Sequence, residues 1–236
     1  MYNNEYILVD DSVEGIGGTA LTLDGLIEPV KDRVEQVATR DISLRKVYEG
    51  RDKIWVFGNI HGLTFDSYQA IMECMQSCTF FKIDFDYGYC IYRGSIPHQQ
   101  LGGRECNCKV NPQALMHRNI YNAIKDRSLH NFYMSRQQLD FHVRDLGVDI
   151  SKCSVLSSCF TRTFFDLINE IKSLHNNEKY AIIDGQGGWH TKAKGVSNAI
   201  DHAKENNLSY DILKTSSHEE LMRALCHYKG LIFLPI

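Results

Sequence analysis

Three cysteines lie in one loop-like stretch of the chain, Cys90, Cys106 and Cys108, and two histidines, His98 and His117, lie near them. Three thiolates and one imidazole can make a tetrahedral zinc site, so these residues predict a structural metal site with either histidine as the fourth ligand. The spacing lacks the paired Cys-x-x-Cys form of zinc ribbons. The alternative interpretation is therefore that these cysteines are buried core residues or thiols without a role in metal binding.

A second group of candidate residues follows short apolar runs that resemble strands. Asp86 comes after one such run, with Arg93 shortly behind it, and His61 comes after another. A carboxylate at the end of a strand can act as a general base, bind an acceptor sugar or pair with the arginine. We expect Asp86 and His61 to be catalytic and Arg93 to bind substrate. The alternatives are a structural ion pair and an incidental loop histidine.

A glycine-rich stretch that includes Gly17 and Gly18 follows the first apolar run. Glycines between a strand and a helix let backbone amides approach a phosphate or a sugar, so both residues are expected to bind substrate. The spacing is not Gly-x-Gly-x-x-Gly. A tight turn that needs a positive φ is therefore the other explanation.

Lys192 and Lys194 precede a segment of helical periodicity, and Trp189 lies just before them. Lysines at the start of a helix, above the carboxyl edge of a sheet, can hold a diphosphate. The stretch contains no Gly-x-x-x-x-Gly-Lys-Ser/Thr motif, so it is not a P-loop. Solvated loop lysines are the alternative.

Short apolar runs alternate with helical patterns along most of the chain. The runs are rich in β-branched and aromatic residues, as are strands buried on both faces. Strands are expected at 6–9, 54–57, 80–85, 131–134, 154–156, 180–183, 210–213 and 230–234. Helices are expected at 67–76, 113–125, 136–146, 164–174, 196–205 and 218–228. This alternation predicts an α/β fold with parallel sheets.

A domain boundary is expected between 157 and 178, where a polar stretch separates two series of strands. We therefore expect one domain at 1–160 and a second at 178–236. The second contains only three expected strands and stops at the end of a strand, where α/β proteins place their sites.

Composition narrows the class of protein. The 236 residues include 26 Lys and Arg against 29 Asp and Glu, a formal net charge of -3. This balance disfavours binding to nucleic acid mainly through phosphates, although a local pocket can still recognise a base. No apolar run approaches the roughly 18 residues of a membrane span, and the N-terminus lacks a secretory signal. We expect a cytoplasmic protein with reduced cysteines.

Several short motifs, taken in order, point to a known family. They are Asp10-Asp11 with the glycine stretch 15–19, residues 55–59, Asp86-Tyr87 with Tyr89-Cys90 and Arg93, residues 105–108, residues 132–135 with Gln137, residues 155–158, Trp189 with Lys194-Gly195, and residues 229–235. In this order they resemble nucleotide-sugar-dependent glycosyltransferases of the GT-B fold, of the group 1 type. The resemblance covers nearly the whole chain.

The resemblance implies two Rossmann-like domains that face each other across a cleft, the first holding the acceptor and the second the nucleotide sugar. It implies that Gly17 and Gly18 lie beside the cleft and that Lys194 binds the donor diphosphate. Trp189 stands where the relatives have an arginine. The phosphate contact is therefore either reduced or completed by Lys192.

The expected function is transfer of a sugar from a nucleotide-sugar donor, hexosyltransferase-like, with no metal or cofactor required for catalysis. The acceptor stays open among a glycan, a lipid, a protein and a nucleic-acid base. Relatives continue into an acidic donor-binding motif, whereas this sequence stops at Ile236. The second domain is therefore expected to be incomplete, transfer to be weak, and an oligomer or a second chain to cover the C-terminal edge.

Two other functions compete with this expectation. The first is a shortened glycosyltransferase-like protein without catalysis, which binds a glycan or a protein or serves as a scaffold. The second is a nucleotide-sugar or dinucleotide enzyme of another Rossmann type. The absence of Gly-x-Gly-x-x-Gly and of a Tyr-x-x-x-Lys pair disfavours the second.

Overall fold

The computed structural model describes residues 5–11, 17–108, 111–171, 177–184, 191–192, 194–214 and 216–234. The chain divides into two compact units, Met1–Cys159 and Phe160–Ile236. Within the described ranges, no helix combines the length and the apolar character needed to cross a membrane.

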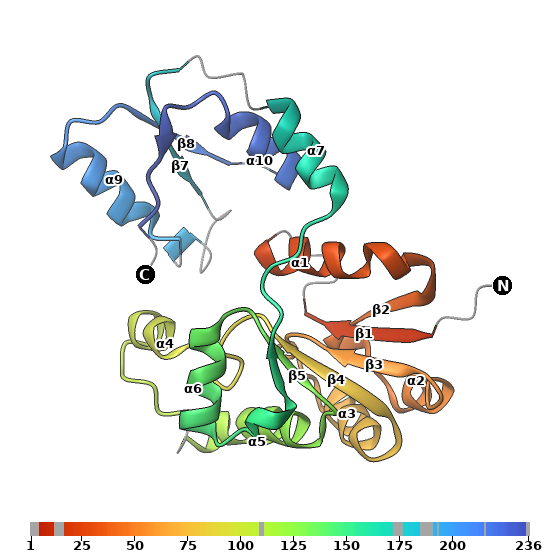
Figure 1. The fold of residues 1–236 in the computed structure, drawn as a ribbon. Helices are drawn as coiled ribbons and strands as arrows, with labels where there is room; N and C mark the ends of the chain where they lie inside the picture. Colours follow the sequence, from red (N-terminus) through yellow and green to blue (C-terminus); the bar gives the residue numbers. More distant parts are fainter. Residues whose placement is uncertain are drawn as a thin grey trace. The chain divides into compact units, whose positions relative to one another are not determined.

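The described part of the first unit contains a six-stranded parallel sheet with the order β2-β1-β3-β4-β5-β6 (Figure 1). The strands are β1 (Tyr6–Asp10), β2 (Val34–Ala38), β3 (Ile54–Phe57), β4 (Thr79–Asp84), β5 (Asn131–Tyr133) and β6 (Cys153–Val155). β1 pairs with β2 on one side and with β3 on the other, so the strand order reverses between β1 and β3. In doubly wound sheets, ligands bind beyond the carboxyl ends of the strands at such a switch point.

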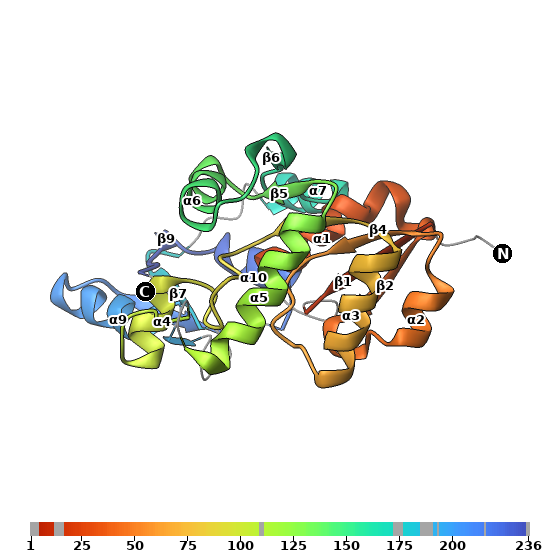
Figure 2. The ribbon, with the colours of Figure 1, turned by 90° about the horizontal axis from the view of Figure 1, so that it is seen from below.

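Helices connect the strands of the first unit. They are α1 (Gly18–Ile27), α2 (Leu44–Glu49), α3 (Phe65–Ser77), α4 (Ser95–Gly102), α5 (Pro112–Arg127) and α6 (Arg136–Leu146), with 3-10 turns at Glu28–Arg33, Thr39–Asp41 and Ile150–Lys152. α2, α3 and α5 cover one face of the sheet, and α1 lies on the other (Figures 1 and 2). From β1 the chain first moves to β2 at one edge of the sheet. It then crosses to β3 on the other side of β1 and continues strand by strand to β6. Right-handed crossovers therefore place the helices on opposite faces.

The largest core cluster of the first unit lies between the sheet and the helices α3 and α5. Trp55 and Phe57 point to the same face of β3 and are fully buried. They pack with Ile71 of α3 and Ile124 of α5. The indole N–H of Trp55 donates to the carbonyl of Gly50 at 2.9 Å. Each large apolar side chain buried here stabilises the fold by about 1.5–3 kcal/mol.

The second unit has, among its described residues, a three-stranded parallel sheet with the order β8-β7-β9. Its elements are α7 (Arg162–Ile171), β7 (Tyr180–Ile183), α9 (Val196–Glu205), β8 (Tyr210–Leu213), α10 (His218–Leu225) and β9 (Gly230–Leu231). Ile182 of β7 packs against Ala199 and Ala203 of α9 in a small core of its own.

The predicted α/β class with parallel sheets is confirmed, while the GT-B arrangement of two domains stays a prediction. The sequence pattern missed β2 because Glu35 and Gln36 interrupt its apolar residues. It also missed α1, α2 and α4. The strand expected at 230–234 ends at Leu231, and the helix expected at 218–228 ends at Leu225. The last residues of the helix expected at 164–174 lie outside the described ranges.

Gly58 shows how closely the strand ends pack. A Cβ at this position would lie 2.1 Å from Oδ2 of Asp10, which accepts the N–H of Asn59 at 2.6 Å. The Gly58→Ala variant must therefore displace a buried carboxylate from its donor. We expect the free energy of unfolding to fall by about 2–3 kcal/mol, measured by urea denaturation.

The control is Gly18→Ala, because a Cβ on Gly18 meets no atom within 4 Å and the residue lies in a helix. Its stability should stay within about 0.5 kcal/mol of the parent chain. Equal stability of the two variants would contradict the packing described for Gly58.

Candidate functional site

Two carboxylates at the end of β1 bind the backbone that follows β3. Asp10 Oδ2 accepts the N–H of Asn59 at 2.6 Å. Asp11 accepts the N–H groups of His61 and Gly62 at 2.6 and 2.9 Å. The N–H of Asp11 donates in return to the carbonyl of Asn59 at 3.0 Å. These bonds fix the segment that carries His61 at the switch point of the sheet.

The His61 side chain is only 13% exposed and lies beside a carboxylate. Its Nδ1 is 3.6 Å from Asp11 Oδ2, its Nε2 is 3.3 Å from the carbonyl of Cys90, and its ring centroid is 5.0 Å from that of His117. Burial by itself raises the pKa of Asp11, but hydrogen bonds from His61 and the neighbouring backbone hold the pKa below its usual range. Burial lowers the pKa of His117 to about 4, so its ring is neutral at pH 7.

Arg93 lies between two carboxylates without forming a close ion pair with either. Nη1 is 3.6 Å from Asp86 Oδ2, and Nη2 is 3.9 Å from Asp11 Oδ2. Both distances exceed hydrogen-bonding range, and 33% of the Arg93 side chain is exposed. The guanidinium can therefore turn toward an anionic or polar substrate.

Asp86 follows β4 and has two unlike carboxylate oxygens. Oδ2 accepts a long hydrogen bond from Asn59 Nδ2 at 3.4 Å, whereas Oδ1 is buried and has no hydrogen-bond partner among the described residues. Burial raises the pKa of Asp86 by more than the nearby His61 and Arg93 lower it. A carboxylate with a raised pKa and one uncommitted oxygen is suited to accept a proton.

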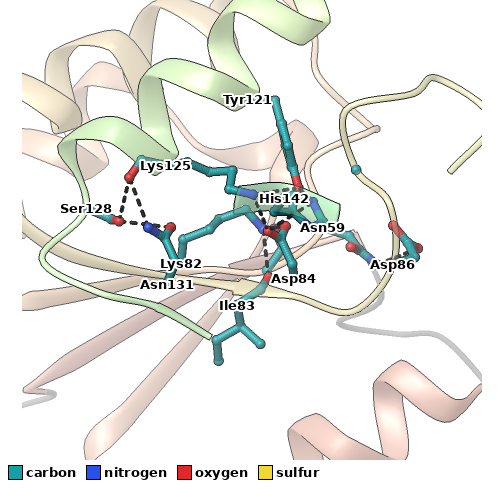
Figure 3. A network of polar contacts seen from close by, with 12 residues as sticks. Asn59, Lys82, Ile83, Asp84, Asp86, Tyr121, Lys125, Ser128, Asn131 and His142 are labelled. Atoms are coloured by element: carbon teal, nitrogen blue, oxygen red, sulfur yellow. Dashed lines mark hydrogen bonds and ion pairs between the residues drawn. The ribbon is translucent and has the colours of Figure 1, made fainter. Parts of the chain in front are cut away.

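Beneath this edge lies a buried charge network centred on Asp84, the last residue of β4 (Figure 3). Lys82 Nζ is 2.8 Å from Asp84 Oδ1, and Lys125 Nζ is 3.1 Å from Oδ2. Lys82 Nζ also donates to the carbonyls of Gly58 and Ile83 at 2.8 and 2.6 Å. An ammonium has three donors, so each proton of Lys82 has an acceptor and the group joins β4 to the end of β3.

The charges of this network stabilise one another. Burial by itself raises the pKa of Asp84, but attraction to Lys125 and Lys82 outweighs it and holds the pKa below its usual range. Burial lowers the pKa of Lys125 to about 8, against the opposing attraction of Asp84. The carboxylate is thus ionised at neutral pH.

Polar side chains extend the network toward Asp86. Tyr121 Oη lies 2.9 Å from His142 Nε2, and His142 Nδ1 lies 2.7 Å from the carbonyl of Gln138. The imidazole therefore donates from Nδ1 and accepts at Nε2. Gln138 Nε2 donates to the backbone carbonyl of Asp86 at 2.8 Å, and Gln138 Oε1 accepts the N–H of Met134 at 2.8 Å. The ends of β4 and β5 are held together in this way.

A separate group of thiols and an imidazole, the Cys/His cluster, is formed by Cys90, His98, Cys106 and Cys108, whose ligand atoms all lie within 4.8 Å of one another. Three of these residues are buried and Cys106 is half-buried. Such a group can hold a metal such as zinc. The sequence was compatible with either His98 or His117 as the fourth ligand, and the structure places His98 in the cluster.

His117 lies elsewhere. Its Nε2 is 2.7 Å from the carbonyl of Gly88, and its ring lies beside that of His61, tilted by 31°. The expectation that it serves as a metal ligand is therefore not supported by its position, because the Cys/His cluster is completed without it.

The structure brings together the other predicted residues of the first unit only in part. His61, Asp86 and Arg93 lie at the carboxyl edge of the sheet, as described above. Gly17 caps α1 with an extended backbone and Gly18 is its first residue, while their contact with a substrate stays a prediction.

In the second unit, Lys192 and Lys194 lie directly before α9. Gly195, the N-cap of α9, has a φ of 63° and donates its N–H to the carbonyl of Lys192 at 2.9 Å. Lys192 is exposed and Lys194 is half-buried. Trp189 lies outside the described residues.

The carboxyl end of β7 carries one more polar group. Asp184 follows β7, accepts a hydrogen bond from Thr191 Oγ1 at 2.5 Å and lies 3.2 Å from Lys214 Nζ. Sequence reasoning did not single out these residues.

Sequence reasoning also missed the residues that hold the first unit's site in place. Asp11 was visible as the second acid after the first strand, and Lys82 as a cation inside an apolar run. Asn59 entered only as the last residue of the motif at 55–59, and nothing local reveals the contacts of Asn59 or Gln138, because their partners lie in segments distant in sequence.

No protein-family model matches this chain, and no curated protein matches its sequence. The resemblance to glycosyltransferases therefore rests on the short motifs of the sequence alone, because an α/β fold is common to many other classes of protein.

His142 should make the stability of the first unit depend on pH. Burial lowers its pKa to about 4, against the opposing attraction of Asp84. The unfolded chain takes up this proton below about pH 6.5, whereas the folded unit resists it until the lower pKa. The contribution to stability is complete above about pH 6.5 and is lost as the pH falls toward 4, by up to about 3 kcal/mol.

Urea denaturation between about pH 7 and about pH 4.5 measures this slope. In His142→Gln, the slope of the unfolding free energy against pH should correspond to about one proton less than in the parent chain. His202→Gln, which changes an exposed position of α9, should have the same slope as the parent chain. An unchanged slope in His142→Gln would show that this histidine is not the group that titrates.

Proposed function

We propose that this chain is a glycosyltransferase that moves a sugar from a nucleotide-sugar donor to an acceptor bound at the carboxyl edge of the first sheet. One observation carries the proposal. The Asp86 carboxylate, held on one oxygen by Asn59 and flanked by Arg93, lies beside the switch point with its other oxygen free of partners in the described structure. This edge is where doubly wound sheets bind their ligands.

Asp86 is assigned the role of general base. Its raised pKa makes it a better proton acceptor than an ordinary carboxylate. In the transfer step, the acceptor oxygen bonds to the anomeric carbon and its proton goes to Asp86. The bond from that carbon to the diphosphate oxygen breaks, and the nucleoside diphosphate leaves with the electron pair.

His61 and Arg93 are assigned to the acceptor. Arg93 is partly exposed and can donate to sugar hydroxyls, while His61 lies between Asp11 and the chain at Cys90. Gly17 and Gly18, at the start of α1, leave room for a substrate close to the backbone.

Lys194 and Lys192 of the second unit are assigned to the donor diphosphate. Ammonium groups and the backbone N–H groups at the start of α9 stabilise the charge that develops on the leaving group. Transfer of this kind uses no metal. Zinc enters the proposal only as a structural ion at the Cys/His cluster.

The alternative is a binding or scaffold protein without transfer, and one observation favours it. Leu231 and Phe233 are 45% and 49% exposed in the second unit, an apolar surface that suits a partner chain or a second copy. A panel of nucleotide sugars in a thermal-shift assay, followed by transfer assays with candidate acceptors, separates the two functions. The cytoplasmic location stays a prediction.

Lys194→Ala tests the donor site. We expect it to weaken binding of the nucleotide sugar found in the thermal-shift panel by about 1–3 kcal/mol, the contribution of a charge-assisted hydrogen bond. Lys204→Ala, which changes an exposed lysine in the last turn of α9, the helix that Lys194 precedes, should leave the affinity unchanged. Calorimetry measures both. Equal affinities for Lys194→Ala and the parent chain would rule Lys194 out as a diphosphate ligand.

Asp86→Asn tests the catalytic assignment. The amide keeps the shape of the side chain but cannot accept the proton, so kcat should fall by about 100-fold or more while donor affinity stays the same. Asp140→Asn, at an exposed position of α6, is the control and should keep full activity. A kcat for Asp86→Asn close to that of the parent chain would refute the role of Asp86.

A further inference from the structure

Cys90 belongs to both the Cys/His cluster and the candidate site at the sheet edge. Its Sγ lies among the ligand atoms of the cluster. Its backbone carbonyl accepts the N–H of Arg93 at 2.8 Å and lies 3.3 Å from His61 Nε2. Its own N–H donates to the carbonyl of Tyr87 at 3.1 Å. Whatever fixes the sulfur of Cys90 therefore also fixes backbone groups that His61 and Arg93 contact.

Four of the six distances between ligand atoms of the cluster match those of a tetrahedral metal site, and the other two are within 4.8 Å. With Zn–S bonds of about 2.3 Å and Zn–N bonds of about 2.0 Å, a tetrahedron has edges of about 3.8 Å between sulfurs and about 3.5 Å between sulfur and nitrogen. Cys90 Sγ lies 3.7 and 3.6 Å from the sulfurs of Cys106 and Cys108. His98 Nδ1 lies 3.3 and 3.4 Å from those of Cys90 and Cys108.

A disulfide explains this arrangement less well. All the cysteines are free thiols in the structure, and the sulfurs lie well beyond the roughly 2.05 Å of an S–S bond. Any one disulfide would also leave a third thiol and the His98 imidazole facing it. His98 is 1% exposed, and its Nδ1 points at two sulfurs. A cation at the centre gives all four groups a common partner.

The segment that carries the cluster needs such a support because its apolar core is small. Cys90 and Cys108 pack with Tyr89, Ala114 and Tyr121, a cluster whose buried members include no Leu, Ile or Val among the described residues. Ile96 of α4 is 60% exposed instead of joining this core. Small cores are commonly stabilised by a bound metal.

Arg93 shows that the segment is held in a conformation that the chain alone disfavours. Its φ is 63°, in the left-handed region that residues other than glycine seldom adopt. Its N–H donates to the Cys90 carbonyl at 2.8 Å, and the N–H of Tyr92 points at Cys90 Sγ at 3.4 Å. A metal-bound thiolate is a stronger acceptor for that N–H than a neutral thiol, because it carries negative charge.

We infer that the Cys/His cluster binds one Zn²⁺ and that the ion, acting through Cys90, positions His61 and Arg93. Binding exchanges thiol protons for the metal and involves no change of oxidation state. His98 binds through Nδ1 and keeps its proton on Nε2. The functional role of positioning His61 and Arg93 rests on the proposed function, whereas zinc binding does not depend on it.

The first experiment measures metal in the full chain, produced with zinc in the medium and purified under reducing conditions without chelator. Elemental analysis should find about one zinc per chain, and X-ray absorption should show three sulfur neighbours and one nitrogen neighbour. After exchange for Co²⁺, the intact chain should show the visible bands of tetrahedral cobalt and a thiolate-to-cobalt charge-transfer band. Absence of bound zinc, an octahedral cobalt spectrum or a disulfide among the three cysteines would overturn the inference.

Matched variants assign the ligands. Cys106→Ser and His98→Gln should lose stoichiometric zinc, whereas Cys159→Ser and His117→Gln should keep it. Cys159 is a half-buried cysteine outside the cluster, and His117 is the histidine that the structure places elsewhere. Loss of zinc from His117→Gln together with retention in His98→Gln would overturn the ligand set. Because Co²⁺ is read in the unmutated chain, poor folding of a variant does not remove the test.

A third experiment tests positioning without any substrate. Diethyl pyrocarbonate labels accessible imidazoles, and mass spectrometry locates the label, with exposed His202 as the internal reference. Removal of zinc with a chelator should speed labelling of both His98 and His61, several-fold relative to His202, and re-addition of zinc should reverse it. A zinc-dependent rate at His98 alone would overturn the positioning role.

These outcomes are separable from the proposed function. A chain that binds zinc and shows the labelling change, but binds no nucleotide sugar, would keep the metal site and refute the transferase. A chain that transfers sugar but holds no zinc when it is produced with zinc in the medium would keep the transferase and refute the metal site.

Discussion

The buried charges around Asp84 constrain the first unit more than any other interaction. Lys82, Asp84 and Lys125 are each at most 1% exposed, so their charges are removed from water and must be compensated inside the protein. An unpaired charge in such a place costs several kcal/mol, which leaves the three side chains essentially one arrangement. Because Lys82 also binds the carbonyl of Gly58, that arrangement includes the point where β3 ends.

The candidate site is built on this constraint from groups that come from loops. Asn59 and His61 follow Gly58 directly, and Asp86 follows Asp84 by two residues. Each is tied back to the sheet: the first two donate their N–H groups to the carboxylates at the end of β1, and Gln138 binds the carbonyl of Asp86. On the outer side, Cys90 provides the corresponding contact to Arg93. A rigid sheet edge beneath and the Cys/His cluster beside it together determine where the polar groups lie.

The sequence predicted those parts of the structure that local patterns encode. β3 and α6 were predicted to the residue, the first because four apolar residues end at Gly58 and the second because Ser135 and Gly147 cap it. The edge strand β2, with two polar residues inside, gave no such signal. The three cysteines were visible as a group, but the choice of His98 depended on α4, a short helix with little amphipathic pattern. The pairing of Lys82 with Lys125 across Asp84 joins a strand to a distant helix, and no spacing rule reveals it.

The most direct test of this account is hydrogen exchange at the amides that follow β3 in a Lys82→Met variant. Methionine keeps the apolar stem, removes the ammonium and leaves Asp84 paired with Lys125, so the fold should persist. If Lys82 positions the site, the amides of Asn59, His61 and Gly62 should exchange about tenfold faster or more, while that of Val47 in α2 keeps its protection. Lys53→Met, a lysine at the other end of β3, should change none of them. Unaltered protection at Asn59 and His61 in Lys82→Met would contradict the claim that the buried charges hold the site in place.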